Sequence, residues 1–140
     1  MDNWTRTFDL LKAITNACPL PTQNLKLNTQ NRDEAIEEKH IQYGPLNLDD
    51  ELYWKRLAKF WKTTSKVAKE SRCGNCVAFD ISSRMEECMP GKTSDNAGRL
   101  GFCWMHHFKC HSARVCYTWA KGGPIKSDKI SKDWQRRSNE

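Results

Sequence analysis

Cysteines are the residues of this chain best suited to chemistry, and most of the seven are concentrated in one region. Cys73 and Cys76 form a C-x-x-C pair, which places two thiolates on one tight loop where they can grip a metal. No strand precedes the pair and no βαβ pattern surrounds it, so the pair does not fit a thioredoxin-like redox loop. The remaining cysteines of this region are Cys88, Cys103, Cys110 and Cys116, whereas Cys18 stands alone. Thiols grouped in this way predict a metal site.

Disulfide bonding is the other use that these cysteines could have. The first residues have no signal-peptide character, and no apolar run approaches the roughly 18 residues that cross a bilayer. We therefore expect a cytoplasmic protein with reduced thiols, in which grouped cysteines bind metal more often than they pair. On this interpretation Cys18 is an ordinary, partly buried thiol. Cys88 and Cys110 are either free thiols or paired with each other.

Zinc is one candidate metal. His107 and His111 have H-x-x-x-H spacing, with His106 beside them. A structural zinc site usually shows a second close ligand pair after the first, and the cysteines that follow Cys76 form no second C-x-x-C. Zinc therefore stays an alternative, and we expect the three histidines to flank the site or lie at the surface.

Aromatic residues accompany the thiols at fixed distances. Phe79 stands three residues after Cys76, Cys103 ends a Gly-Phe-Cys sequence, and Trp119 stands three residues after Cys116. This C-x-x-C-x-x-F … G-x-C … C-x-x-W arrangement resembles small [4Fe–4S] proteins of the high-potential iron–sulfur type. It is also similar to the iron–sulfur small subunits of certain glycyl-radical decarboxylases and benzylsuccinate synthases.

The resemblance covers roughly residues 72–123 and implies a buried [4Fe–4S] cluster that transfers one electron at a time. The ligands that it implies are Cys73, Cys76, Cys103 and Cys116, and the aromatic residues that would shield the cluster are Phe79, Phe102, Trp104 and Trp119. A second alignment uses Cys88 as the third ligand and Cys103 as the fourth. We prefer Cys116 to Cys88 because only Cys116 has an aromatic residue three positions later.

Residues 101–108 (GFCWMHHF) are also similar to uncharacterised proteins of marine tailed phages, which would place the protein in the cytosol of a host cell. Catalytic motifs such as G-x-S-x-G, the P-loop, G-x-G-x-x-G and H-E-x-x-H do not occur. Four thiolate ligands would occupy all four irons of a cubane and leave no open coordination position. An electron carrier or an accessory subunit is therefore expected rather than an enzyme, with a structural cluster as the nearest variant.

Positive charge lies on the two flanks of the cysteine region within a chain of net charge +6. Residues 47–72 carry seven basic and four acidic residues, and residues 120–140 carry six and three. These flanks predict docking to a redox protein or a larger enzyme. Tryptophans among the basic residues would also suit nucleic acid, although acidic residues interrupt both stretches. The alternative function is therefore a zinc- or cluster-stabilised module that binds nucleic acid or assembles a larger complex.

The elements that must position the cysteines are short. Residues 1–46 are predicted to be a helical arm and connector: Trp4, Phe8, Leu11 and Ile14 share one helical face, residues 19–32 form a polar connector, and Asp33 to His40 form a short acidic helix. Residues 47–123 combine the cysteine region with one helix, which begins with a cap at Asn47. Its core-facing stripe comprises Tyr53, Leu57, Phe60, Trp61, Thr64, Val67 and Ala68.

Turn residues break the chain after Cys73, and residues 88–101 are predicted to be a polar insertion loop. Residues 124–140 are a basic tail that is either a short docked helix around Trp134 or disordered. The sequence therefore predicts a small metal-organised domain, mostly irregular with short helices and strands, preceded by amphipathic α-helices.

Overall fold

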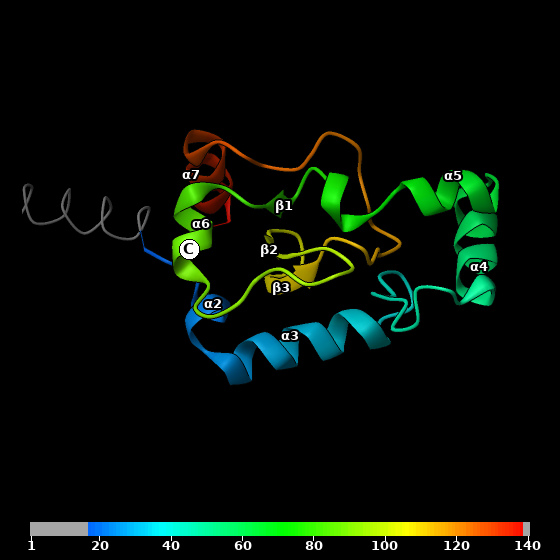
Figure 1. The fold of residues 1–140 in the computed structure, drawn as a ribbon, viewed down its shortest axis with the longest axis horizontal. Helices are drawn as coiled ribbons and strands as arrows, with labels where there is room; N and C mark the ends of the chain where they lie inside the picture. Colours follow the sequence, from blue (N-terminus) through cyan, green and yellow to red (C-terminus); the bar gives the residue numbers. More distant parts are fainter. Residues whose placement is uncertain (1–16, 139–140) are drawn as a thin grey trace, which may run out of the picture.

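The computed structural model describes residues 17–138, in which short helices surround a small antiparallel sheet (Figure 1). The strands are β1 (Phe79–Asp80), β2 (Leu100–Cys103) and β3 (Phe108–His111), in the order β1-β2-β3. This arrangement confirms the prediction of an irregular domain with short helices and strands. The predicted helical face from Trp4 to Ile14 lies outside the described residues.

The register of the sheet places cysteines on one face. Cys103 of β2 lies opposite Phe79 of β1 and Phe108 of β3, and Gly101 lies opposite Cys110. Because side chains alternate between the two faces of a strand, Cys103 and Cys110 share a face, while Phe102 points to the other. The alternation of side chains along β2 and β3 therefore brings two of the thiols to the same face of the sheet.

Two helices occupy the segment predicted to be a connector, so that prediction was wrong. They are α2 (Leu20–Gln23) and α3 (Leu25–Glu37), and the Asn24 side chain caps α3 by accepting from the Leu27 N–H. Helix α3 packs on β3 through amides: Asn28 Oδ1 accepts from the Lys109 N–H at 2.7 Å, and Asn31 Nδ2 donates to the His107 carbonyl at 2.7 Å. Because α3 is attached through asparagines, it has no apolar stripe. Its helical period could therefore not be recognised from the hydrophobic residues of the sequence.

The predicted aromatic-striped helix is two helices, α4 (Glu51–Trp61) and α5 (Ser65–Glu70), which lie together at one end of the molecule (Figure 1). Helix α4 ends where Lys62 adopts φ +57°, and it is capped at its start by Asp50 rather than Asn47. The stripe is therefore interrupted: Phe60 is 58% exposed and Val67 is 46% exposed. The buried side chains of this pair pack with those of residues 115 and 117, forming a second core of Tyr53, Trp54, Leu57, Ala58, Ala68, Val115 and Tyr117.

Helices α6 (Ser83–Cys88) and α7 (Asp128–Arg137) pack together at the opposite end (Figure 1). The tail is therefore a docked helix over residues 128–137, the first of the two predicted states. Buried Asp80 connects it to the sheet, because its carboxylate accepts hydrogen bonds from the Trp104 indole at 2.9 Å and from the Ser131 hydroxyl. The same carboxylate accepts from the Ser82 N–H at 2.9 Å.

Replacing Asp80 by Ala is expected to lower the free energy of unfolding by about 3 kcal/mol, because three buried donors lose a charged acceptor. Urea unfolding measures the change. Asp49→Ala, at an exposed aspartate, is the control and should change stability by less than about 0.5 kcal/mol. Equal stability of the two variants would contradict the role assigned to Asp80.

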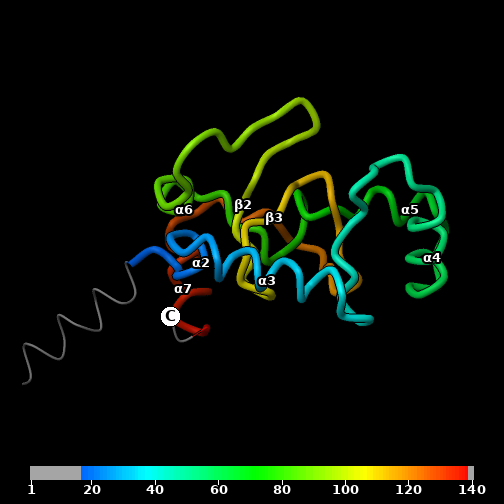
Figure 2. Tube along the Cα trace, turned by 90° about the horizontal axis from the view of Figure 1, so that it is seen from below, coloured from blue at the N-terminus to red at the C-terminus, as the bar shows by residue number. Residues whose placement is uncertain are grey.

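The segment between α6 and β2 projects from the body of the molecule as a loop (Figure 2), as predicted for residues 88–101. Its mostly exposed residues are organised by Asp95, whose carboxylate accepts from the N–H groups of Ala97 and Gly98 at 2.8 and 2.9 Å. Over residues 17–138, no helix has the length and apolar character that a bilayer crossing requires.

Candidate metal centre

Five buried cysteines line one small apolar pocket, here called the cysteine centre: Cys73, Cys76, Cys103, Cys110 and Cys116. They are between 2% and 8% exposed, and none of them is in a disulfide. The structure therefore brings all four predicted ligand residues together. It also places a fifth, Cys110, among them, which was predicted to be a bystander.

Three different parts of the chain deliver these cysteines. Cys73 begins a 3₁₀ turn (Cys73–Asn75) that leads to Cys76, while Cys103 and Cys110 come from β2 and β3. Cys116 comes from the segment between β3 and the tail. Backbone hydrogen bonds hold the turn against that segment, from the Cys73 N–H to the Arg114 carbonyl at 2.7 Å and from the Gly74 N–H to the Ser112 carbonyl at 3.0 Å.

Backbone N–H groups point at three of the sulfurs. The N–H groups of Ala78 and Ala120 donate to Cys76, and those of Met105 and His106 donate to Cys103. At Cys116 the donors are the N–H of Thr118 and its hydroxyl, the latter at 3.1 Å from the sulfur. Such donors stabilise a thiolate over a thiol.

The pKa values of the thiols reflect two opposing effects. Burial raises the pKa of Cys76 and Cys116, and the hydrogen-bond donors oppose that rise. A hydrogen bond from the Cys110 thiol, together with the N–H donors, lowers the pKa of Cys103. Burial raises the pKa of Cys110, and its hydrogen bonds to Cys103 and Cys73 raise it further. Cys110 is therefore the thiol that keeps its proton while it donates to its neighbours.

The walls of the cysteine centre are apolar. Phe79, Met105 and Trp119 line it, so two of the four predicted shielding residues contact it and Met105 was missed. The other two, Phe102 and Trp104, are buried but do not line the centre. Their rings pack against each other with centroids 4.8 Å apart, and the Trp104 indole donates to Asp80. They support the sheet that carries Cys103.

Cys88 lies outside the centre in a disulfide with Cys18. The prediction of a free Cys18 was therefore wrong. Of the two alternatives for Cys88 and Cys110, pairing with each other is wrong, whereas the free thiol holds for Cys110 and not for Cys88. The alternative alignment with Cys88 as a ligand does not match its position. Cys88 ends α6 beside α2, where the Gln23 side-chain amide donates to its carbonyl at 2.6 Å. Packing of α6 against α2 thus selects a partner 70 residues away in sequence.

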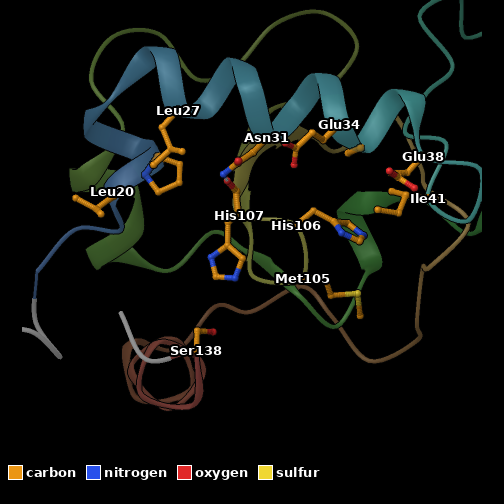
Figure 3. Close-up of a pocket in the computed structure, with 12 residues that line it drawn as sticks. Leu20, Leu27, Asn31, Glu34, Glu38, Ile41, Met105, His106, His107 and Ser138 are labelled. Atoms are coloured by element: carbon orange, nitrogen blue, oxygen red, sulfur yellow. Dashed lines mark hydrogen bonds between the residues drawn. The ribbon is translucent and has the colours of Figure 1, made fainter.

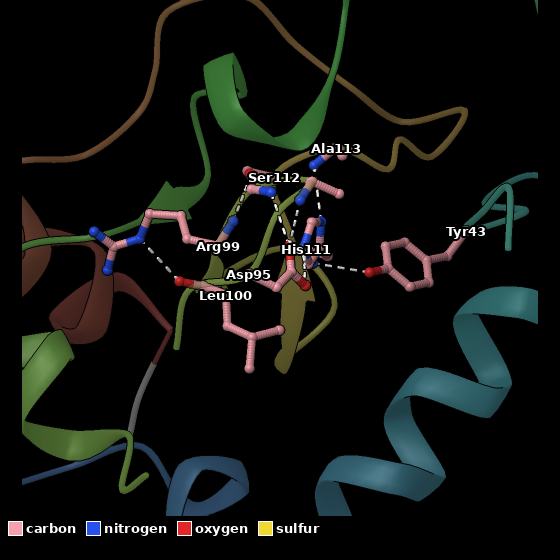
Figure 4. Close-up of polar contacts among 9 residues, drawn as sticks. Tyr43, Asp95, Arg99, Leu100, His111, Ser112 and Ala113 are labelled. Atoms are coloured by element: carbon pink, nitrogen blue, oxygen red, sulfur yellow. Dashed lines mark hydrogen bonds and ion pairs between the residues drawn. The ribbon is translucent and has the colours of Figure 1, made fainter. Parts of the chain in front are cut away.

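The histidines flank the centre. His111 Nδ1 accepts from the Ala113 N–H at 3.1 Å, so Nε2 carries the proton and donates to Asp95 at 3.0 Å (Figure 4). His106 Nε2 lies 2.7 Å from the Thr118 hydroxyl, and burial lowers the pKa of His106, which keeps its ring neutral at pH 7. Over residues 17–138, no three His, Cys, Asp or Glu side chains are arranged to hold a single metal ion.

The surroundings of Gly101 show why the Gly-Phe-Cys sequence begins with a glycine. A Cβ at this position would lie 2.5 Å from Cζ of Phe79, the ring that lines the cysteine centre. Gly101→Ala is therefore expected to displace that ring and to lower the free energy of unfolding by about 2 kcal/mol in urea titrations.

The control for Gly101→Ala is the double variant with Phe79→Ala. If the clash is the cause, the two changes together should cost less than the sum of the single changes. Additive losses would contradict the proposed contact between Gly101 and Phe79.

Compared with protein-family models, with curated proteins and with solved structures, the chain gave no match. The chemistry of the cysteine centre is therefore inferred from its own residues.

Proposed function

We propose that this chain binds a [4Fe–4S] cluster through Cys73, Cys76, Cys103 and Cys116 and uses it for one-electron transfer. The observation that carries the proposal is the convergence of five buried cysteines, none of them in a disulfide, on one apolar pocket, with hydrogen-bond donors at three of the sulfurs. Neutral thiols in an apolar pocket need no such donors, whereas metal-bound thiolates are oriented and tuned by them. Four thiolates buried in this pocket would require a bound cation to balance their charge.

The chemistry of the donor set fits an iron–sulfur cluster. Soft thiolate ligands select zinc, copper(I) or iron–sulfur clusters. A single zinc ion would draw its four ligands to about 2.3 Å, and the described side chains are not arranged around one ion in this way. A cubane binds each thiolate through a separate iron, and the resemblance of residues 72–123 to high-potential iron–sulfur proteins supports the cluster over zinc. The space between the sulfurs is about 10 Å³, so the thiols must move apart when the group binds.

The protein's own residues would set the properties of the bound group. When bound, the cluster supplies a one-electron redox couple. Phe79, Met105 and Trp119 exclude water from it, and the N–H donors withdraw electron density from the sulfurs, which favours the reduced state. Protonated Cys110 acts in the same direction, as a donor to Cys103.

The surface of α4 and α5 supports docking of an acidic partner, such as a redox protein or a larger enzyme. Its exposed lysines surround the exposed side chains of Leu52, Phe60 and Val67. Apolar side chains within a basic surface are typical of protein interfaces with charge-selected partners. We propose this surface as the contact of an electron carrier or accessory subunit.

Purification without oxygen tests the proposed function. The protein should be brown, absorb broadly near about 400 nm, and contain about four irons and four sulfides per chain. A colourless protein with one zinc ion per chain would overturn the cluster and support the structural-zinc alternative.

A further inference from the structure

A second hollow lies beside the cysteine centre. It is a cavity of about 540 Å³ between α3 and the turn that carries residues 105–107, here called the α3 groove (Figure 3). This volume is in the range of pockets that bind small organic molecules. Helix α2 and residue Ser138 complete its walls.

The α3 groove is acidic on a chain of net charge +6. Glu34 of α3 and Glu38, the residue that follows this helix, project into the groove, and none of the described residues that line it is Lys or Arg. Opposite them lie the imidazoles of His106 and His107. His40 does not line the groove, and its Nδ1 lies 3.6 Å from the Glu38 carboxylate. The rest of the lining is largely aliphatic, so the groove suits a cation with an apolar body.

Two connections link the groove to the cysteine centre. Met105 lines both, so its side chain is a shared wall. His106 lines the groove and lies 2.7 Å from the Thr118 hydroxyl, which is 3.1 Å from the Cys116 sulfur. A molecule in the groove is therefore separated from the thiols by Met105 alone, or by His106 and Thr118 in succession. Either route is a short path for an electron.

We propose that the α3 groove binds a small organic cation that exchanges one electron with the cysteine centre. The electron exchange rests on the proposed function, whereas the binding does not. With a reduced bipyridinium in the groove, one electron leaves the bipyridinium and is taken up at the oxidised centre. No bond forms or breaks and no proton moves.

Methyl viologen, a planar dication, is the probe for binding. Calorimetric titration of the metal-free chain should show one saturable site, and Glu34→Gln with Glu38→Gln should weaken binding by about tenfold. Glu37→Gln, on α3 but outside the groove, is the matched control and should leave affinity unchanged. Anthraquinone disulfonate, a planar dianion, should not bind. Absence of saturable binding, equal loss in the control or equal binding of the dianion would overturn the proposal.

Electron exchange is tested separately on the iron-loaded chain. Below saturation, reduced methyl viologen should react about tenfold more slowly with the double variant than with the native protein, in proportion to its weaker binding. Dithionite, an anionic reductant, should react with both at similar rates. Unchanged viologen rates would refute exchange through the groove. Iron content reports on the proposed function alone, and binding to the metal-free chain reports on the groove alone, so their failures are distinguishable.

Discussion

Replacing Cys116 by Ala is expected to abolish cluster binding, leaving well below one iron per chain after purification without oxygen. Cys116 is 6% exposed, and the N–H and hydroxyl of Thr118 are already directed at its sulfur. The variant retains all other thiols of the centre. Loss of a ligand leaves one iron without a protein thiolate, and the remaining cluster is open to hydrolysis.

Cys110→Ala is the matched control, because Cys110 is an equally buried thiol of the same pocket. It should retain about four irons, since its S–H donates to Cys103 and its sulfur does not bind metal. Loss of a donor worth about 1 kcal/mol should lower the reduction potential by roughly 40 mV. Loss of iron from Cys110→Ala, with retention in Cys116→Ala, would reverse the two assignments.

The disulfide is expected to have the largest effect on stability of any contact discussed above. Cys18 and Cys88 close a loop of 70 residues, for which chain entropy predicts a loss of about 4 kcal/mol when both become Ala. Guanidinium unfolding of the oxidised protein measures this loss. The double variant should still bind about four irons, because neither residue lines the cysteine centre.

The control for the double variant is the native protein unfolded with and without a thiol reductant. Reduction should reproduce the loss in the native protein and have no effect on the stability of the double variant. If the variant instead lost its iron, Cys88 would be acting as a ligand, in agreement with the alternative alignment.

That Cys73, Cys76, Cys103 and Cys116 lie together could be predicted, because the sequence patterns that indicate it are each only a few residues long. The C-x-x-C loop and the Gly-Phe-Cys sequence fix neighbouring geometry within a few residues, and Trp119 follows Cys116 by one turn. Cys110 was missed because its place depends on strand register, which puts it opposite Gly101. The sequence pattern that could have revealed it is the two-residue spacing of Phe108 and Cys110. This spacing places both residues on one face of a strand that follows Cys103 after a short turn.

Long-range packing accounts for what the sequence could not predict. The Cys18–Cys88 pair depends on how α2 meets α6, which no local pattern encodes. Helix α3 is attached through Asn28 and Asn31, whose amides give no hydrophobic period. The α3 groove exists only because that helix lies across the 105–107 turn, so no local pattern in the sequence could assign Glu34 and Glu38 to it.

The core of α4 and α5 has a consequence for the metal ligands. Val115 and Tyr117 belong to this second core, and Cys116 lies between them, whereas the other ligands belong to the sheet and its adjoining turn. The Cys116 backbone is therefore anchored on both sides by a hydrophobic core that does not include the other four cysteines of the centre. Substitutions at Trp54 or Leu57 are accordingly expected to move Cys116 within the cysteine centre, although neither side chain lines it.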